Sequence, residues 1–138
     1  MTRIVLDTNI FISAIIKSGK PRKILKKGIG GNYSLVISGE ILQEIIGVLR
    51  RPKFNMAEAD VRKIMFGIIE SSETISIRSK FKVVKNDPDD DIVVNTAYDG
   101  NADYIVSGDS DLLKLKNFKG IRIVTVDEIL IILEKDSS

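Results

Sequence analysis

Short apolar runs recur along the chain, separated by longer segments in which apolar residues follow helical spacing. The runs are rich in β-branched residues, which is typical of buried strands. Five of them are predicted as strands: "RIVL" (3–6), "SLVIS" (34–38), "TISI" (74–77), "YIVS" (104–107) and "IRIVTV" (121–126).

The intervening segments carry apolar residues three and four positions apart, which predicts amphipathic helices. These helices are expected at residues 8–17, about 21–29, 39–51, about 57–71, 88–100, 109–115 and 128–135. Terminal signals support several of them: Ser38 suits an N-cap, Pro52 follows a helix end, and Thr125 with Glu128 forms a capping-box pattern.

The alternation of strands and helices predicts an α/β fold with a mostly parallel sheet. The 138 residues suit one domain spanning 1–138, without an internal repeat or a linker. In parallel sheets, ligands bind outside the carboxyl ends of the strands, near the point where the strand order reverses. Candidate site residues are therefore sought at that edge.

The composition removes several classes of chemistry. The chain has no Cys and no His, which excludes disulfides, thiol nucleophiles, most zinc and haem sites, and His-dependent triads. Chemistry based on carboxylates remains, namely Mg²⁺ or Mn²⁺ catalysis or glycoside hydrolysis. No apolar run has membrane-spanning length, and the charge at Asp7 leaves no room for a signal peptide, so we expect a cytoplasmic protein.

Basic residues gather in three stretches, 17–27, 50–53 and 114–122, although the net charge is only +2. Such clusters are often solvated helix surface, but three of them beside an acidic centre favour a polyanion as partner. The candidate RNA-binding residues are Lys20, Arg22, Lys23, Arg50 and Arg51.

Two acids follow predicted strands directly. Asp7 ends the first strand, and Asp109 lies just past the strand at 104–107. Each could simply cap the next helix, because Asp is favoured at that position. Both nevertheless fall at the ligand-binding edge of the same sheet.

The stretch "NDPDDD" (86–91) opens a helix with Asp87 as N-cap and Pro88 as its first residue. At about 100° per residue, Asp90 lies on the apolar stripe of Val93, Val94 and Ala97 and therefore points inward. Asp89 and Asp91 are predicted to project to the sides or toward water. A buried carboxylate must be protonated, paired with Lys or Arg, or bound to metal.

The helix at 39–51 contributes Glu44, at the margin of its apolar stripe, whereas Glu40 in the first turn is explained by the helix dipole. If Asp7, Glu44, Asp90 and Asp109 meet, their mutual repulsion favours Mg²⁺ or Mn²⁺. A metal-activated water is then the natural nucleophile in a chain without His. Thr8, Asn9, Ser107 and Asp111 are auxiliary candidates, with helix capping or turn closure as the alternative.

These segments resemble a PIN-domain ribonuclease. The resemblance covers "IVLDTNIFISAI", "SGEILQEIIGVLRRPKF", "DPDDDIVVNTAYDGNADYIVSGDSDLLKL" and "IRIVTVDEIL", in order and over nearly the whole chain. It is greatest with the prokaryotic VapC-type toxins of toxin–antitoxin pairs. It implies a three-layer α/β/α sandwich, Mg²⁺- or Mn²⁺-dependent RNA cleavage, a homodimer and often an antitoxin partner. The family's four acids fall on Asp7, Glu44, Asp90 and Asp109.

The leading hypothesis is a metal-dependent endoribonuclease in which Asp7, Asp90 and Asp109 hold the metal and Glu44 helps to bind or orient the attacking water. One alternative is a non-catalytic PIN-like RNA-binding or assembly module. Another is an acidic-pocket Mg²⁺-binding receiver domain, although "SLVISGE" lacks the Asp that a receiver needs at its middle strand. Glycoside hydrolysis fits less well, because only 6% of the residues are aromatic.

Overall fold

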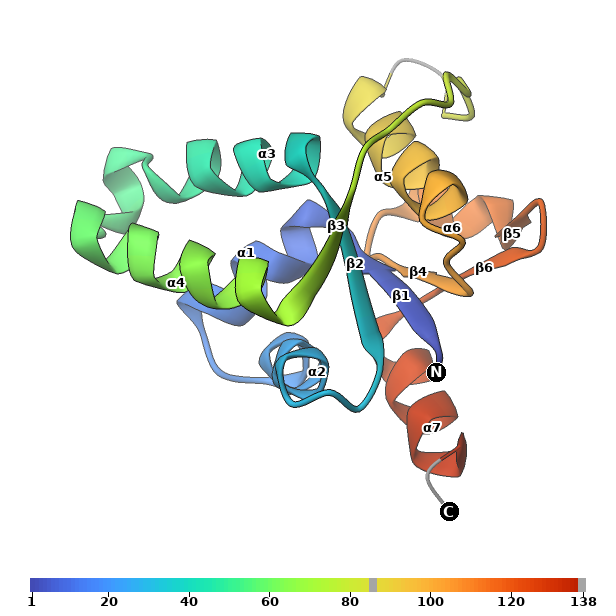
Figure 1. The fold of residues 1–138 in the computed structure, drawn as a ribbon, viewed down its shortest axis with the longest axis horizontal. Helices are drawn as coiled ribbons and strands as arrows, with labels where there is room; N and C mark the ends of the chain where they lie inside the picture. The colour runs from blue at the N-terminus through green and yellow to red at the C-terminus, as the bar shows by residue number, and fades with distance from the viewer. Residues whose placement is uncertain (85–86, 137–138) are drawn as a thin grey trace.

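The computed structural model describes residues 1–84 and 87–136, which form a six-stranded sheet with helices on both faces (Figure 1). The strand order is β3-β2-β1-β4-β6-β5, and every pairing is parallel except that of β5 with β6. The strands are β1 (Arg3–Leu6), β2 (Ser34–Ser38), β3 (Ser72–Ile75), β4 (Tyr104–Val106), β5 (Asn117–Phe118) and β6 (Ile121–Val124). The predicted α/β class with a mostly parallel sheet is confirmed.

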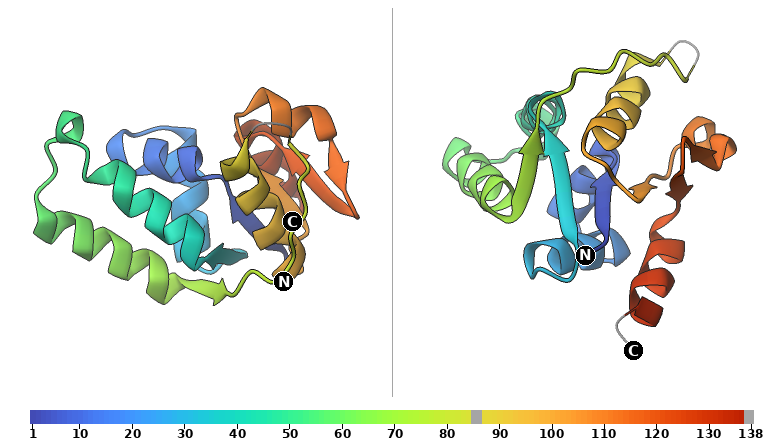
Figure 2. Two further views of the ribbon diagram at one scale, coloured as in Figure 1. Left: turned by 90° about the horizontal axis from the view of Figure 1, so that it is seen from above. Right: turned by 45° about the vertical axis from the view of Figure 1, so that its right-hand side comes forward.

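The helices are α1 (Thr8–Ile16), α2 (Lys20–Ile29), α3 (Gly39–Leu49), α4 (Glu58–Ser71), α5 (Pro88–Asp99), α6 (Ser110–Leu115) and α7 (Val126–Asp136), with a 3₁₀ turn η1 (Pro52–Phe54). From β1 the chain moves outward to β2 and β3, and then returns past β1 to β4. Because such crossovers are right-handed, the first connections cover one face with α1–α4, and α5 covers the other. Packing of α5 on β1, β2 and β4, and of α7 on α2, completes three layers (Figure 2).

Most predicted elements form where the sequence indicated. Ser38 accepts a hydrogen bond from the Ile41 N–H, and Thr125 and Glu128 exchange the two bonds of a capping box. The main differences concern three strands. The strand predicted at 74–77 lies at 72–75, because α4 passes straight into it, and the two-residue strand β5 was too short to leave a pattern. The strand predicted at 121–126 ends at Val124, because α7 begins at Val126.

The segment before α5 is held by side chains instead of a strand partner. Asp99 accepts from the N–H groups of residues 78 and 79, Asn95 exchanges hydrogen bonds with Phe81, and Asp91 accepts from the N–H groups of residues 83 and 84. These three residues, four positions apart, form a polar stripe along α5. Asp91, predicted to project sideways or toward water, therefore lies on the side of α5 and fixes the approach to the helix.

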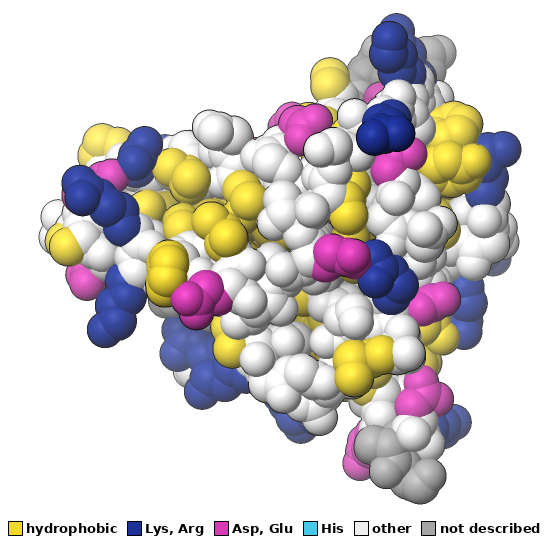
Figure 3. All heavy atoms as spheres, viewed as in Figure 1, with side chains coloured by type: hydrophobic (Ala, Val, Ile, Leu, Met, Phe, Trp, Pro, Cys, Tyr) yellow, Lys and Arg dark blue, Asp and Glu magenta, His cyan; other side chains and the backbone are white. Residues whose placement is uncertain are grey.

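None of the helices in the described ranges combines the length and apolarity needed to cross a bilayer. Apolar side chains do reach the surface over the α3–α4 pair, at the left of Figure 3. Phe66 and Ile69 of α4 are 63% and 46% exposed.

Gly100, which ends α5, allows the helix to approach β2 closely. A Cβ at this position would lie 2.5 Å from Val36 Cγ1 and 2.9 Å from the Thr96 carbonyl oxygen. We expect Gly100→Ala to lower the free energy of unfolding by about 1–3 kcal/mol in urea denaturation, because Val36 is fully buried and cannot move aside. In the matched variant Gly47→Ala the new methyl meets nothing within 4 Å, and it should stabilise α3 by about 0.5–1 kcal/mol. Equal stability of Gly100→Ala and the unaltered protein would contradict this packing.

Candidate metal centre

Two of the predicted acids flank the point at which the strand order reverses. Asp7 follows β1, and Asp109 lies three residues after the end of β4, the neighbouring strand. The Asp7 N–H donates to the Val106 carbonyl, which draws the two strand ends together. Topology therefore brings these acids, far apart in sequence, to one edge of the sheet.

Ser107 links the two acids. Its hydroxyl donates to Asp7 Oδ2 at 2.8 Å and accepts from the Asp109 N–H at 2.9 Å, and its side chain is fully buried. Asp7 occupies the N-cap position of α1, and its side chain makes no capping hydrogen bond of good geometry, although the Thr8 and Asn9 N–H groups lie near enough to lower its pKa. Its carboxylate therefore faces both the start of α1 and Ser107.

Asp109 does cap a helix. Its Oδ1 accepts from the N–H groups of Asp111 and Leu112, at 2.8 and 3.3 Å, at the start of α6. A carboxylate has two oxygens and about four acceptor sites, so capping leaves part of Asp109 available to a ligand.

Asp90 and Asp87 complete an acidic cluster. Asp90 lies in the first turn of α5 and is only 5% exposed, as its place on the apolar stripe predicted. Asp87 caps α5 by accepting from the Asp90 N–H at 3.3 Å. One carboxylate oxygen from each of Asp87, Asp90 and Asp109 lies within 4.8 Å of the others.

The sequence interpretation assigned Asp87 to the helix end alone. Its position before Pro88, one turn ahead of the inward-facing Asp90, was the available signal for a second role. Asp87 is half-buried, and its carboxylate can serve both the helix end and the cluster.

The surroundings of Asp90 disfavour its ionised form. Burial raises the pKa of Asp90 to about 7, and the negative charges of Asp109, Asp87 and Asp7 add to that rise. Its Oδ2 is buried and makes no hydrogen bond to any described residue. Within residues 1–84 and 87–136, no Lys or Arg forms the ion pair with Asp90 that the pairing alternative requires.

The charges of the cluster also act on Asp7 and Glu44. Burial is the main cause that raises the pKa of Asp7, and the nearby charge of Asp109 adds to it, while the Ser107 hydrogen bond opposes the rise. The pKa of Glu44, in the middle of α3, is raised by partial burial and by the charges of Asp89 and Asp7. The structure thus brings all four predicted acids to one region and adds Asp87.

This donor set fits a hard divalent cation. Buried or half-buried carboxylate oxygens converge, no Lys or Arg of residues 1–84 and 87–136 forms an ion pair with them, and the buried Asp90 Oδ2 has no hydrogen-bond partner among those residues. Mg²⁺ and Mn²⁺ take oxygen ligands and are bound through a few carboxylates. Asp87, Asp90 and Asp109 could hold such an ion directly, with Asp7 adjoining them.

The auxiliary candidates have distinct surroundings. Thr8 is buried and near Glu44, and its hydroxyl makes no hydrogen bond of good geometry to a described residue. Asn9 is exposed, and so is Asp111, whose carboxylate lies 3.9 Å from the Lys114 ammonium. Ser107 donates a side-chain hydrogen bond of good geometry to Asp7, whereas Asp111 contacts Asp109 through its backbone N–H.

The basic candidates lie away from the acids. Arg22 donates to the carbonyls of Ala14 and Ile15 at the far end of α1, which separates it from Asp7 by a nine-residue helix, about 13 Å long. Lys20 pairs with Asp127 of α7. Arg50 pairs with Glu58, at the end of α3 beyond Glu44, and Arg51 beside it is exposed. The fold therefore does not place these cations around the acidic cluster.

Removal of the Ser107 hydroxyl should lower the free energy of unfolding. In Ser107→Ala the buried Asp7 Oδ2 loses its donor and the Asp109 N–H loses its acceptor, so we expect a loss of about 1–3 kcal/mol in urea denaturation at neutral pH. Ser110→Ala, which removes an exposed hydroxyl from the first turn of α6, is the control and should change stability far less. Equal effects of the two substitutions would mean that the Ser107 bridge contributes nothing specific.

A family model and a related protein each match most of this chain. The model of the PIN domain family matches residues 3–111. A relative in Methanocaldococcus jannaschii, protein MJ1680, is 34% identical over 119 residues, which cover 83% of this chain and 76% of that protein.

Two solved structures share the fold at lower identity. PAE2754 from Pyrobaculum aerophilum superimposes with a TM-score of 0.63 and 15% identity, covering 98% of this chain and 90% of that one. VapBC2 from Rickettsia felis, solved bound to a DNA fragment from its promoter, gives a TM-score of 0.60 and 17% identity, covering 90% of this chain and 98% of that one.

Proposed function

Because this chain belongs to the PIN domain family, whose members are generally nucleases, we propose that it is a metal-dependent endoribonuclease that hydrolyses RNA phosphodiester bonds. One observation carries the proposal: a buried Asp90 oxygen, without a hydrogen-bond partner in the described ranges, faces a group of acids with which no described Lys or Arg forms an ion pair. The ionised form of such a carboxylate is costly unless a proton or a bound cation neutralises it.

Mg²⁺ or Mn²⁺, held by Asp90 and Asp109 with Asp7 and Asp87, would polarise the scissile phosphate and lower the pKa of a water. The chain's own groups support this chemistry. Ser107 orients the Asp7 carboxylate, and the α6 N-terminus holds Asp109 through two N–H groups. These hydrogen bonds fix the acids before any ligand arrives.

Glu44 is suited to accept a proton or orient a water. The pKa of Glu44 is raised toward neutral pH, so its carboxylate is a better base than that of an exposed Glu. It lies close to Asp7 and to the Thr8 hydroxyl, on a helix that does not supply the other acids. We assign to Glu44 the role of binding or orienting the attacking water, and to Thr8 the role of positioning Glu44.

We further propose that the protein acts as the toxin of a toxin–antitoxin pair, as a homodimer with an antitoxin partner. The support is the family, together with the shared fold of the Rickettsia felis VapBC2 structure. Expression of the chain alone in a bacterial host should arrest growth, and co-expression of the adjacent gene should relieve the arrest. Unimpaired growth despite abundant active enzyme would reject the toxin role but not the nuclease.

The nuclease proposal is tested directly with purified protein and a labelled structured RNA. Cleavage should appear with Mn²⁺, disappear with EDTA, and be absent from Asp7→Asn protein prepared in the same way. RNA binding without cleavage at saturating Mn²⁺ would instead support the non-catalytic RNA-binding alternative. Cleavage that persists in the Asp7→Asn preparation would identify a contaminating nuclease.

A further inference from the structure

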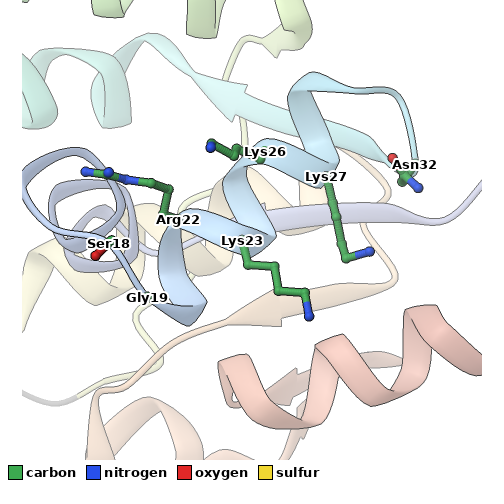
Figure 4. Close-up of a pocket in the computed structure, with 7 residues that line it drawn as sticks. All are labelled: Ser18, Gly19, Arg22, Lys23, Lys26, Lys27 and Asn32. Atoms are coloured by element: carbon green, nitrogen blue, oxygen red, sulfur yellow. The ribbon is translucent and has the colours of Figure 1, made fainter.

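A second charged surface lies on α2, away from the acidic cluster. Arg22, Lys23, Lys26 and Lys27 line a hollow of about 470 Å³ between α2 and its flanking loops (Figure 4). Arg22 and Lys26 lie on one side of the exposed face of α2, and Lys23 and Lys27 lie on the other. Two short rows of cations therefore border one helix face.

No acidic residue lines this hollow, and α2 itself contains none. Lys23, Lys26 and Lys27 form no ion pair within the described ranges, whereas Lys20 at the start of the helix is paired with Asp127. Four like charges without a counter-charge repel one another, so the surface is stabilised when it meets an anion.

The helix itself does not require this pattern. Cations near a helix C-terminus interact favourably with the macrodipole, which accounts for Lys26 and Lys27. Arg22 and Lys23 lie in the first turn, where the dipole opposes positive charge. Arg22 has a structural task at the α1 carbonyls, but exposed Lys23 makes no comparable contact in the described chain.

The chemistry of the hollow selects among anionic partners. The residues that line it are Lys, Arg, Ser, Asn and Gly, and although the carbon stems of the cations supply much of the surface, no aromatic or aliphatic anchor side chain is present. A peptide helix or strand would need apolar pockets for its side chains. A nucleic-acid backbone is instead bound by Lys and Arg at its phosphates without such pockets.

We propose that the α2 hollow binds the phosphate backbone of RNA at a point about one α1 helix length, roughly 13 Å, from the acidic cluster. The choice of RNA rests on the proposed function, whereas the anion site rests on the hollow itself. A strand held at both places would be anchored away from the bond to be cut, so α2 would contribute affinity and the acids would contribute chemistry.

The test is equilibrium binding of a fluorescent single-stranded RNA of about 20 nucleotides, longer than one such site covers, to the full chain in EDTA. The double variant Lys23→Ala/Lys26→Ala removes one exposed cation from each row. It keeps Arg22, whose side chain hydrogen-bonds to carbonyls of α1. We expect about tenfold weaker binding, and a slope of log K against log salt reduced by about 1.4 for two lost phosphate contacts.

The matched control is Lys63→Ala/Lys80→Ala, which removes the same charge from exposed positions outside the hollow and should change affinity less than about twofold by screening alone. Equal losses in the two double variants would overturn the α2 site. Displacement of the RNA from the unaltered protein by poly-glutamate at equal charge concentration would also overturn it, in favour of an acidic protein partner. Thermal melts of both variants establish that they are folded.

The two proposals fail separately. Since binding is measured without metal, a specific loss at α2 stands even if no cleavage is ever observed. Conversely, Mn²⁺-dependent cleavage with no specific effect of the α2 substitutions would leave the nuclease in place and remove the α2 site.

Discussion

Replacement of Asp90 by asparagine is expected to reduce Mn²⁺-dependent RNA cleavage by about a hundredfold to a thousandfold, while the metal-free protein becomes more stable. The two effects have the same origin. Asp90 is 5% exposed and surrounded by the charges of Asp109, Asp87 and Asp7, so its ionised form is costly without a cation. The amide keeps the shape of the side chain but lacks the charge that attracts a metal.

Cleavage of labelled RNA and thermal melts in EDTA at about pH 8 measure the two effects in one preparation. Asp60→Asn is the matched control, because it removes the same charge from an exposed position in the first turn of another helix, α4, outside the acidic cluster. A loss of activity accompanied by a loss of metal-free stability would indicate a packing defect. Full activity in Asp90→Asn would remove Asp90 from the metal centre.

The metal-free protein should lose stability as the pH rises from about 5 to about 8. The folded-state pKa of Asp90 is about 7, above its ordinary value of 3.8, so the folded state binds more protons than the unfolded state within this window. Stability from this group is fully present below about pH 4 and is lost as the pH rises through 7. The raised pKa values of Asp7 and Glu44 act in the same direction. We expect the melting temperature in EDTA to fall by about 5 °C or more.

Saturating Mn²⁺ should reverse this trend, because it binds the ionised carboxylates, and its stabilising effect should be larger at pH 8 than at pH 5. Differential scanning fluorimetry across the pH series, with and without Mn²⁺, gives both curves. In Asp90→Asn the pH dependence should be much smaller. A melting temperature that stays level or rises with pH in EDTA would contradict the buried-charge interpretation.

The parts of the site that could be predicted from sequence depend on local geometry. Asp87, Pro88 and the apolar stripe of α5 together fix where the helix starts and which side of it faces the core, so the inward direction of Asp90 follows from residue spacing alone. Asp7 and Asp109 could be placed at one sheet edge because parallel strands end together. The positions of Asp7, Asp90 and Asp109 rest on these two regularities, and that of Glu44 rests on the margin of the apolar stripe of α3. Their catalytic roles stay predictions.

The other parts depend on contacts between distant segments. The second use of Asp87 depends on Asp109, which comes more than twenty residues later in the chain and lies beside Asp87 in the fold. The conformation of the segment at 76–84 is set by the side chains of Asp91, Asn95 and Asp99, which come up to twenty-one residues later in the chain. The sequence likewise does not show where a charge cluster lies in the fold, so the separation of the α2 cations from the acids could not be predicted.

The pairing of β1 with β4 also affects how the protein is made. Ile4 lies opposite Tyr104, and Ser107 bonds to Asp7 across the same interval of one hundred residues. During translation, the central strand must therefore wait for about one hundred further residues before its second neighbour exists. A nascent or prematurely terminated chain that ends before Asp109 lacks a complete acidic centre, so the acids can gather only after β4 has been synthesised.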